Sequence, residues 1–484
     1  MAQTISRPRA AGDPPHVIVV GAGMAGLTAA FELEQAGCTC TIVEAERSHV
    51  GGRVRTHRFS NGQYGELGAM RLPDTHKTVL DYVKKFGLTT RPFINSSPNA
   101  YFYLRGQRER YLRYDRIRQL YQLRPGEREK TLLQLWGLAV DPIIESLTEV
   151  ERDDLANSDS WKTAKIDGLD QLSIHQVLER AGLSPEAIEL VGVALGVGET
   201  LLEAAATEHL REELSALWAG DFHEIVGGME LLPNAFLRAL TTKPRMGCEV
   251  VRLERDETTG RVAAICRLGD KTERVEGDYL VCTIPFSVLQ RVAADPPFSG
   301  GKQRAIREIT YESATKVLVN AKRRFWETDD AILGGASYTD LLTGPIFYPS
   351  DNRLGGDEDR SRGPGPLLIC YNWGEAARRL GVLPASEREQ LAVDLVSGLH
   401  PQLTAEPGLV ADKVSWAWHT HRWSCGAFAF YLPGQFARLH RDVVAPEGRI
   451  HFAGEHTSRS HTWIEGAMES GHRAAGEIIT RAGR

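Results

Sequence analysis

Residues 16–26 read HVIVVGAGMAG, and this stretch decides the fold. Residues 17–20 are β-branched and apolar without polar alternation, which is typical of a strand buried on both faces of a parallel sheet. Gly21, Gly23 and Gly26 then supply the GxGxxG spacing, which permits a tight turn, close approach to a pyrophosphate and close helix packing. The stretch therefore predicts a strand, a turn and a helix whose N-terminus binds phosphate.

The residues that follow complete this unit. A helix is expected from about Ala25 to Gln35, ending before Gly37, because glycine is a common residue at helix C-termini. A second strand at 40–43 ends at Glu44, about twenty residues beyond the glycines, where a carboxylate can bind a ribose hydroxyl. This order of strand, helix, strand and acid favours a nucleotide-binding unit over a structural glycine turn.

A second glycine pair extends the pattern. Residues 48–56 read SHVGGRVRT, with Gly51 and Gly52 followed by Arg53 and Arg55. These residues either add N–H donors and positive charge near the same pyrophosphate or form an ordinary turn with solvated arginines. Together, the three motifs resemble the flavin-dependent amine oxidase superfamily and, within it, the L-amino acid oxidase (flavin monoamine oxidase) family. The resemblance implies FAD, not NAD, as the cofactor.

The resemblance also implies an α/β (α+β) fold of the two-dinucleotide-binding-domain type. Such a fold combines a discontinuous Rossmann-like FAD domain, a mixed-sheet substrate domain and a helical insertion. The length of 484 residues agrees with two or three domains. We expect a flexible leader at 1–15, the FAD-binding domain at 16–63, 227–308 and 446–484, the substrate-binding domain at 64–109 and 309–445, and the helical domain at 110–226.

Composition narrows the class of protein. Hydrophobic residues make up 42% and charged residues 25% of the chain, as in an ordinary globular enzyme. A net charge of −6 without a basic tract disfavours nucleic acid as a partner. There is no long apolar stretch and no signal-peptide pattern, so we expect no membrane span and a cytoplasmic location. The seven scattered cysteines lack CxxC spacing, so we expect reduced core residues and no metal site.

Periodicity predicts elements elsewhere in the chain. Apolar spacing predicts a helix at 76–86 and largely helical structure over 101–225. Residues 278–285 are expected to form another buried strand. Residues 309–320 alternate as one strand, and the pattern alone would place Lys316 at a sheet edge.

Residues 64–73 read YGELGAMRLP, where Gly65, Gly68 and Ala69 would let the backbone approach a flat group. The segment resembles one that passes along the flavin ring in L-amino acid oxidases and ends in an arginine that binds the substrate carboxylate. That arginine corresponds to Arg71, whose planar fork suits a carboxylate. A surface arginine before a proline turn is the alternative.

The resemblance implies three more roles near the flavin. Lys316 corresponds to a lysine that holds a water next to flavin N5, where a buried amine can assist oxygen reduction or imine hydrolysis. Tyr371 corresponds to the tyrosine that shares the substrate carboxylate with Arg71, although a core tyrosine with a satisfied hydroxyl is also possible. Trp463 corresponds to an aromatic pocket wall.

The C-terminal run from residue 449 predicts a last strand, a turn at Gly454 and a helix that starts near Trp463. Glu455 can bond ribitol or bridge to phosphate. The helix dipole, directed at the flavin pyrimidine ring, would stabilise negative charge on reduced flavin. Thr462 stands where the family commonly has glycine.

Two further positions bear on the cofactor. Trp423 corresponds to an aromatic residue beside the flavin. Ala427 stands where covalently flavinylated monoamine oxidases have cysteine, so non-covalent FAD is predicted; Cys425 is two places away.

These readings give the following candidates. The catalytic set is Lys316, Arg71, Tyr371 and Trp463, and the substrate-binding set is Arg71, Tyr371, Trp373, Phe428, Thr462 and Trp463. The cofactor-binding set is Gly21, Gly23, Met24, Ala25, Gly26, Glu44, Ala45, Gly51, Gly52, Arg53, Gly68, Ala69, Met70, Arg71, Val251, Trp423, Gly454, Glu455, Trp463 and Ile464.

The activity that the resemblance implies is FAD-dependent oxidative deamination of L-amino acids to 2-oxo acids, with O2 as acceptor, release of ammonia and hydrogen peroxide, and a homodimeric assembly. A monoamine or polyamine oxidase, an amino acid 2-monooxygenase giving an amide and carbon dioxide, and a flavin-binding scaffold without turnover remain alternatives. The preferred side chain is also open. Trp373, Phe428 and Trp463 favour large apolar or aromatic substrates, whereas Glu212 and Glu465 would favour basic ones. Glu212, Trp218 and His223 are interpreted as ordinary helical-region residues, with the access path as the alternative.

Overall fold

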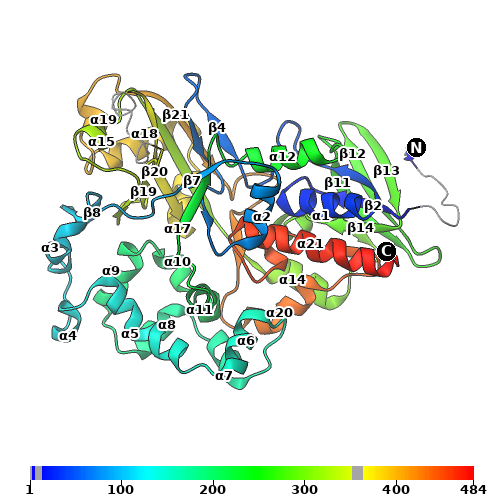
Figure 1. Cartoon of the computed structure of the whole chain (residues 1–484), viewed down its shortest axis with the longest axis horizontal. Coiled ribbons are helices and arrows are strands. Elements are labelled where there is room, and N and C mark those ends of the chain that lie inside the picture. Colours follow the sequence, from blue (N-terminus) through cyan, green and yellow to red (C-terminus); the bar gives the residue numbers. More distant parts are fainter. Residues whose placement is uncertain (1–2, 6–13, 352–362, 484) are drawn as a thin grey trace.

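The computed structural model describes residues 3–5, 14–351 and 363–483 (Figure 1). Its nucleotide-binding part contains a four-stranded parallel sheet in the order β23-β14-β2-β3. The strands are β23 (Ile450–Phe452), β14 (Tyr279–Cys282), β2 (His16–Val20) and β3 (Thr39–Val43). Strands from the start, middle and end of the chain therefore meet in one sheet, as a discontinuous Rossmann-like domain requires.

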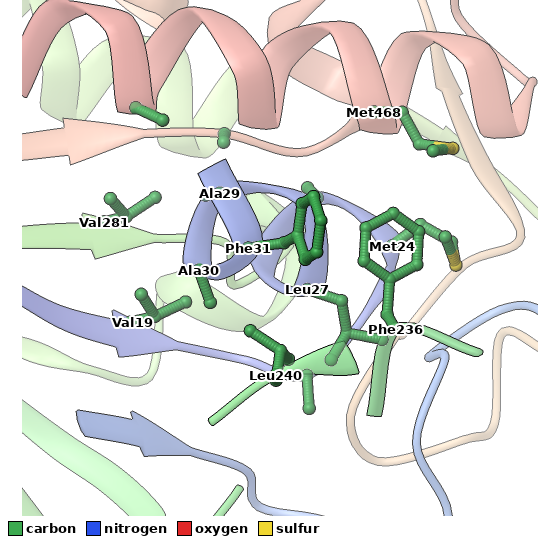
Figure 2. Close-up of a cluster of buried hydrophobic side chains, with 14 of the residues drawn as sticks. Val19, Met24, Leu27, Ala29, Ala30, Phe31, Phe236, Leu240, Val281 and Met468 are labelled. Carbon is green, nitrogen blue, oxygen red and sulfur yellow. The ribbon is translucent and has the colours of Figure 1, made fainter. Parts of the chain in front are cut away.

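Helix α1 (Met24–Gln35) packs between α21 (Ile464–Arg481) and α12 (Leu231–Ala239) beside this sheet. Figure 2 shows Met24, Leu27 and Phe31 of α1 enclosed by side chains of its neighbours, among them Phe236 and Met468. A Cβ on Gly471 of α21 would overlap the carbonyl oxygen of Ala25, so glycine permits this close helix contact. The predicted first helix, second strand and C-terminal helix are confirmed within one or two residues.

A second sheet adjoins this part, in the order β1-β13-β12-β11-β15. Its strands are β1 (Gln3–Ile5), β13 (Lys271–Gly277), β12 (Arg261–Leu268), β11 (Glu249–Asp256) and β15 (Ala293–Asp295). Most of the predicted leader, residues 1–15, lies outside the described residues. Gln3–Ile5 nevertheless pair in parallel with β13, so a wholly flexible leader is wrong for that segment.

The third part is a seven-stranded mixed sheet, in the order β21-β17-β20-β19-β18-β8-β9. Its strands are β21 (Val410–Ala417), β17 (Ala314–Ala321), β20 (Gly365–Trp373), β19 (Ile346–Phe347), β18 (Ala336–Thr339), β8 (Tyr101–Leu104) and β9 (Gln107–Arg110). The β18–β8 pair is parallel and the other pairs are antiparallel, so the expected mixed sheet is confirmed.

The expectation that 101–225 is largely helical is wrong at both ends. Residues 101–110 form the β8–β9 hairpin, and the region ends in β10 (Phe222–Ile225), which lies between β6 (Leu72–Pro73) and β7 (Thr90–Pro92). The residues between β9 and β10 form helices, most of which lie at the bottom of Figure 1. They are η1 (Tyr111–Arg113), α3 (Tyr114–Arg118), α4 (Pro125–Arg128), α5 (Leu132–Glu145), α6 (Glu149–Asn157), α7 (Ala164–Asp170), α8 (Ile174–Arg180), α9 (Pro185–Ala194), α10 (Gly198–Leu202) and α11 (Ala206–Leu214).

The predicted single strand at 309–320 is two strands in different sheets. β16 (Thr310–Glu312) pairs with β22 (Phe428–Phe430), and β17 begins after Ser313. The Glu312 carboxylate accepts hydrogen bonds from the backbone N–H groups of Ser313 (2.6 Å) and Gly374 (3.0 Å) at the break. β17 is buried along its whole length between β20 and β21, so the edge position of Lys316 is wrong.

The remaining elements surround these sheets. They are the hairpin β4 (Thr56–Arg58)–β5 (Tyr64–Glu66), α2 (Lys77–Lys85), α13 (Phe286–Leu289), α14 (Gly300–Glu308), α15 (Phe325–Thr328), α17 (Gly374–Gly381), α18 (Ala385–Val396), α19 (Gln402–Ala405), α20 (Gln435–Val444) and η2 (Glu455–Thr457). The predicted helix at 76–86 is α2, and the predicted strand at 278–285 is the shorter β14. The domain limits given above stay predictions.

No helix within residues 14–351 and 363–483 is long and apolar enough to cross a membrane. Six of the seven cysteines are buried, as expected of core residues, and Cys425 is partly exposed. In the described part of the chain, no group of three or more His, Cys, Asp or Glu side chains is placed to hold a metal ion.

Candidate active site

A cavity of about 550 Å³ runs from the glycine turn after β2 to the seven-stranded sheet. Most of the predicted site residues line it: Gly21, Gly23, Met24, Ala25, Glu44, Ala45, Gly51, Gly52, Arg53, Gly68, Ala69, Val251, Lys316, Tyr371, Trp423, Phe428, Gly454, Glu455, Thr462, Trp463 and Ile464. Four others, Gly26, Met70, Arg71 and Trp373, are not among the lining residues. The sequence motifs therefore meet around one elongated space.

The three glycines of the first motif have different roles. A Cβ on Gly26 would overlap the carbonyl oxygen of Gly21, and a Cβ on Gly21, whose φ is +108°, would overlap the Thr283 hydroxyl. A Cβ on Gly23 would find no atom nearer than Gly52 Cα at 4.0 Å. Gly23 is also the N-cap of α1 and supplies no side-chain cap. Free space and free N–H groups at a helix N-terminus fit a phosphate group.

Glu44 follows β3 at the same end of the cavity. Its carboxylate accepts hydrogen bonds from the backbone N–H groups of Ala22 and Glu46, both at 2.7 Å. Burial raises the pKa of Glu44, and the two N–H bonds oppose that rise. A carboxylate has about four acceptor positions, so Glu44 keeps acceptors for a ribose hydroxyl. The space beside Gly23, the N–H groups at the start of α1 and the remaining acceptors of Glu44 together fit a dinucleotide.

Arg53 and Glu455 form an ion pair near the start of α21. Arg53 donates to Glu455 at 2.8 Å and to the Ala427 carbonyl at 3.0 Å. Glu455 also accepts from the backbone N–H groups of Ala429 (3.0 Å) and Thr462 (3.1 Å). Direct binding of Arg53 to pyrophosphate and of Glu455 to ribitol stay predictions, because much of their bonding capacity is used internally.

The N-terminus of α21 faces the cavity. Its N-cap is Trp463, which supplies no side-chain cap, and Trp463 and Ile464 both line the space. Thr462 before it has φ +72°, in the left-handed region that favours glycine. The threonine therefore keeps the backbone conformation that a glycine would adopt. An uncapped helix N-terminus at this position suits negative charge on a bound ring.

Lys316 lies on β17, and only 1% of it is exposed. Its ammonium nitrogen donates to the Gly68 carbonyl at 2.6 Å and to the Glu66 carbonyl at 3.3 Å. Burial lowers the pKa of Lys316 to about 7, opposed by the Glu66 carboxylate and assisted by Arg71. Burial also raises the pKa of Glu66 to about 8. Lys316 can therefore gain or lose a proton near neutral pH, as groups at reaction sites often do.

Arg71 lies next to this cavity inside a cage of aromatic rings. Its guanidinium carbon is 5.0 Å from the Trp218 ring centre and 5.4 Å from that of Phe222, with Phe93, Phe347 and Trp463 at 5.7–6.0 Å. Burial lowers its pKa, but an arginine with so high an ordinary pKa keeps its charge.

Arg71 donates one hydrogen bond, to Asn95 Oδ1 at 2.7 Å, and forms no ion pair with any carboxylate of the described residues. Asn95 was not predicted, because no local pattern relates it to Arg71. The fork of a buried cation without an anionic partner is a ready site for a carboxylate.

The structure adds a structural role to two of the residues discussed above, Gly68 and Glu465. A Cβ on Gly68 would overlap the backbone of Arg53, so this glycine is required by internal packing and not only by a flat ligand. The Glu465 carboxylate accepts from the N–H groups of Thr78 and Val79, both at 2.8 Å, at the start of α2. Glu465 thus caps α2 and is not among the residues that line the cavity, and a preference for basic substrates through Glu465 stays a prediction.

Two aromatic candidates lie toward the helical region. The Trp373 ring centre is 4.8 Å from that of Tyr371, and its indole N–H is buried. Phe428 lines the cavity and packs in a small apolar cluster with Trp373. Substrate contacts of both residues stay predictions.

The parallel nucleotide-binding sheet and the space at two uncapped helix N-termini define a dinucleotide-binding protein, with the buried Lys316 beside the same cavity. Residues 24–479 match the family model of flavin containing amine oxidoreductase. The chain is 34% identical over 479 residues to the YobN protein of Bacillus subtilis (strain 168), covering 97% of this chain and 95% of that one. It is 31% identical over 473 residues to the L-amino-acid oxidase of Vipera ammodytes ammodytes, covering 96% and 93%.

Among solved structures, putrescine oxidase bound to putrescine superposes with a TM-score of 0.72 at 22% identity, covering 99% of this chain and 100% of that one. Cyclohexylamine oxidase from Brevibacterium oxydans IH-35A gives 0.73 at 20% identity, covering 97% and 100%. These two structures show the same fold. The chain belongs to the flavin-containing amine oxidoreductase family, and it is a flavin enzyme of oxidative deamination with FAD as the cofactor.

Proposed function

We propose that the chain is an L-amino-acid oxidase, which converts an L-amino acid to a 2-oxo acid with release of ammonia and hydrogen peroxide. The observation that carries this proposal is the aromatic cage of Arg71. Its guanidinium is positively charged, surrounded by apolar rings, and without a carboxylate partner in the described chain. A substrate that carries both an amine and a carboxylate supplies that partner.

Residues of two helix N-termini and the acid after β3 would hold FAD. They are Gly23 and its neighbours at α1, Glu44, and Trp463 with Ile464 at α21. When bound, FAD supplies the two-electron acceptor for C–H and N–H oxidation and passes the electrons to O2. Ala427 lines the cavity at the position where the resemblance places the cysteine of covalently flavinylated monoamine oxidases. We therefore expect acid precipitation to release FAD and leave colourless protein.

The chain's own residues perform the positioning and the proton handling. Arg71 fixes the substrate carboxylate with its planar fork, so that the α-carbon is held in one orientation. The rings around Arg71 exclude water, which strengthens this ion pair and favours the neutral amine of the substrate. Lys316, with a pKa of about 7, can hold or release a proton beside Tyr371. We also expect a homodimer, as the resemblance implies, and keep the cytoplasmic location as a prediction from the sequence.

The test compares two substrates that differ by the carboxylate alone, L-phenylalanine and 2-phenylethylamine. Arg71→Met should raise the KM for L-phenylalanine by about 10- to 100-fold, the loss expected for a charged hydrogen-bonded pair. The same variant should leave the already poor reaction of 2-phenylethylamine unchanged and should keep its FAD. An equal effect on both substrates would remove the carboxylate clamp. Formation of 2-phenylacetamide and carbon dioxide would instead indicate the monooxygenase reaction.

A further inference from the structure

We propose that Glu212 is a positioning residue of this site, which holds the indole rings of Trp218 and Trp463 as two walls around the Arg71 guanidinium. This inference rests on the proposed function, because it assigns the walls to the carboxylate pocket. It also revises the interpretation of Glu212 and Trp218 as ordinary residues of the helical region.

The contacts of Glu212 are specific. From α11, its Oε2 accepts a hydrogen bond from Trp218 Nε1 at 2.7 Å, and its Oε1 accepts one from Trp463 Nε1 at 3.1 Å. Trp463 is the N-cap of α21, whereas Trp218 lies in the loop between α11 and β10. One carboxylate therefore connects the helical insertion to the helix that faces the flavin cavity.

Both indoles contact the same cation. The guanidinium carbon of Arg71 is 5.0 Å from the centre of Trp218 and 6.0 Å from that of Trp463. The two indole rings are 5.9 Å apart and inclined at 58°. Because the attraction between a cation and an aromatic face depends on ring orientation, fixing both N–H groups fixes the pocket around Arg71.

The charge of Glu212 is held away from the guanidinium. Burial lowers the pKa of Arg71, and Tyr338, Tyr371 and then Glu212 oppose this effect, yet Glu212 forms no ion pair with Arg71. Both of its oxygens accept indole N–H groups, so neither occupies the arginine fork. Arg71 is charged in any case, and its fork keeps its donors for an incoming carboxylate.

Trp218 needs such a restraint more than Trp463 does. It is 48% exposed, and its loop leaves α11 through Ala216, which has φ +52°. Without its hydrogen bond, a half-exposed indole can adopt several rotamers. Substrate binding must then order the ring, and the lost rotamer entropy weakens binding. Loss of Glu212 should therefore weaken binding of the carboxylate more than it slows chemistry.

The next residue offers a matched control. Glu213, also on α11, accepts a hydrogen bond from Trp136 Nε1 at 2.7 Å. Trp136 packs against the hydrophobic cluster of the helical region, not against Arg71. Glu213→Ala thus removes the same chemical bond from the same helix without touching the proposed pocket.

The test measures binding of benzoate, an aromatic carboxylate without an amine, to the oxidised holoenzyme by the change in flavin absorbance. Glu212→Ala should weaken benzoate binding about tenfold, and Glu212→Gln, which keeps one acceptor oxygen, should weaken it less. Glu213→Ala should bind benzoate like the wild type. With L-phenylalanine, Glu212→Ala should raise KM while kcat stays within about twofold.

Three results would be decisive. Wild-type benzoate affinity in Glu212→Ala, with weakened affinity in Arg71→Met, would overturn the role of Glu212 and leave the proposed function standing. Wild-type affinity in Arg71→Met would contradict the proposed function itself. If Glu212→Ala does not retain FAD, Trp218→Phe, which keeps a ring but deletes the N–H, should weaken benzoate binding. Unchanged binding in Trp218→Phe would then overturn the inference.

Discussion

Lys316 and Tyr371 are direct partners in the antiparallel pair β17–β20, and the Lys316 nitrogen lies 4.1 Å from the centre of the Tyr371 ring. On the other side of β17, Lys316 is paired with Trp416 of β21. The sheet register therefore places the buried amine against the face of the Tyr371 ring. A ring face attracts the charged form, whereas burial opposes it.

The first prediction concerns this amine. Because the pKa of Lys316 is about 7, the amine is charged below that pH and neutral above it. If its neutral form accepts a proton during turnover, the rate of flavin reduction by substrate should rise through pH 7 and level off above it. Lys316→Met should lower this rate by about 10²–10⁴-fold, the usual contribution of proton transfer, and remove the step from the pH profile. Stopped-flow absorbance measures the rate.

Lys302 is the control for this experiment. It is also a buried lysine whose pKa burial lowers to about 7, but it lies on α14, between the Phe452 ring and the Val443 carbonyl. Lys302→Met should retain the step in flavin reduction near pH 7. A step that survives in Lys316→Met and disappears in Lys302→Met would reassign the titrating group.

The second prediction concerns stability. The pKa of Lys302 is lower in the folded chain than its ordinary value of 10.5, so the protonated lysine destabilises the fold. This penalty is complete below about pH 7 and fades as the pH rises toward 10.5. Lys302→Met should therefore raise Tm at pH 6 by a few degrees, and the gain should shrink by pH 9, in thermal unfolding followed by circular dichroism. A gain that grows with pH would contradict the assignment.

The third prediction separates two glycines of the first motif. Gly26→Ala should destabilise the protein even without FAD, because its Cβ overlaps the Gly21 carbonyl; the cost of such overpacking is about 1–3 kcal/mol. Gly23→Ala has room within the protein and should keep the Tm of the FAD-free form, yet it should weaken FAD binding. FAD titration and thermal unfolding of the FAD-free protein measure the two effects. Equal loss of stability in both variants would show that Gly23 is also a packing residue.

The fourth prediction tests the cap at α2. His76, the N-cap of α2, supplies no side-chain cap, and Glu465 accepts from Thr78 and Val79 in its place. Glu465→Ala should cost about 0.5–2 kcal/mol of stability, and Glu465→Gln less. Urea unfolding measures both variants. The ratio of kcat/KM for L-lysine and L-phenylalanine should stay unchanged, and a shift in that ratio would return Glu465 to the substrate pocket.

The parts of the fold that were predicted from sequence are those specified by neighbouring residues. The unit β2–α1–β3 is encoded by an apolar run, glycines at fixed spacing and a capping glycine, all within thirty residues. The β8–β9 hairpin was missed because Phe102 pairs with Tyr338, far along the chain, and its own residues carry no clear alternation. The break at Ser313 depends on Gly374, which no local pattern could show.

The candidate site also combines residues that could be predicted from the sequence with residues placed by distant segments. Lys316 and Arg71 were found by resemblance, but their surroundings come from distant segments. Asn95 binds Arg71 from the loop after β7, and Glu212 reaches Trp463 across 251 positions of sequence. Side chains such as these are placed by tertiary packing, and single-sequence periodicity contains no information about them.

The most direct measurement is anaerobic mixing of the purified FAD-loaded protein with L-amino acids one at a time, while the flavin absorbance is followed. The account predicts rapid bleaching by some L-amino acids, including L-phenylalanine, with none by their D-forms or by 2-phenylethylamine over the same time. Bleaching by carboxylate-free amines alone would contradict the account, because Arg71 would then have no substrate carboxylate to bind and the enzyme would be an amine oxidase.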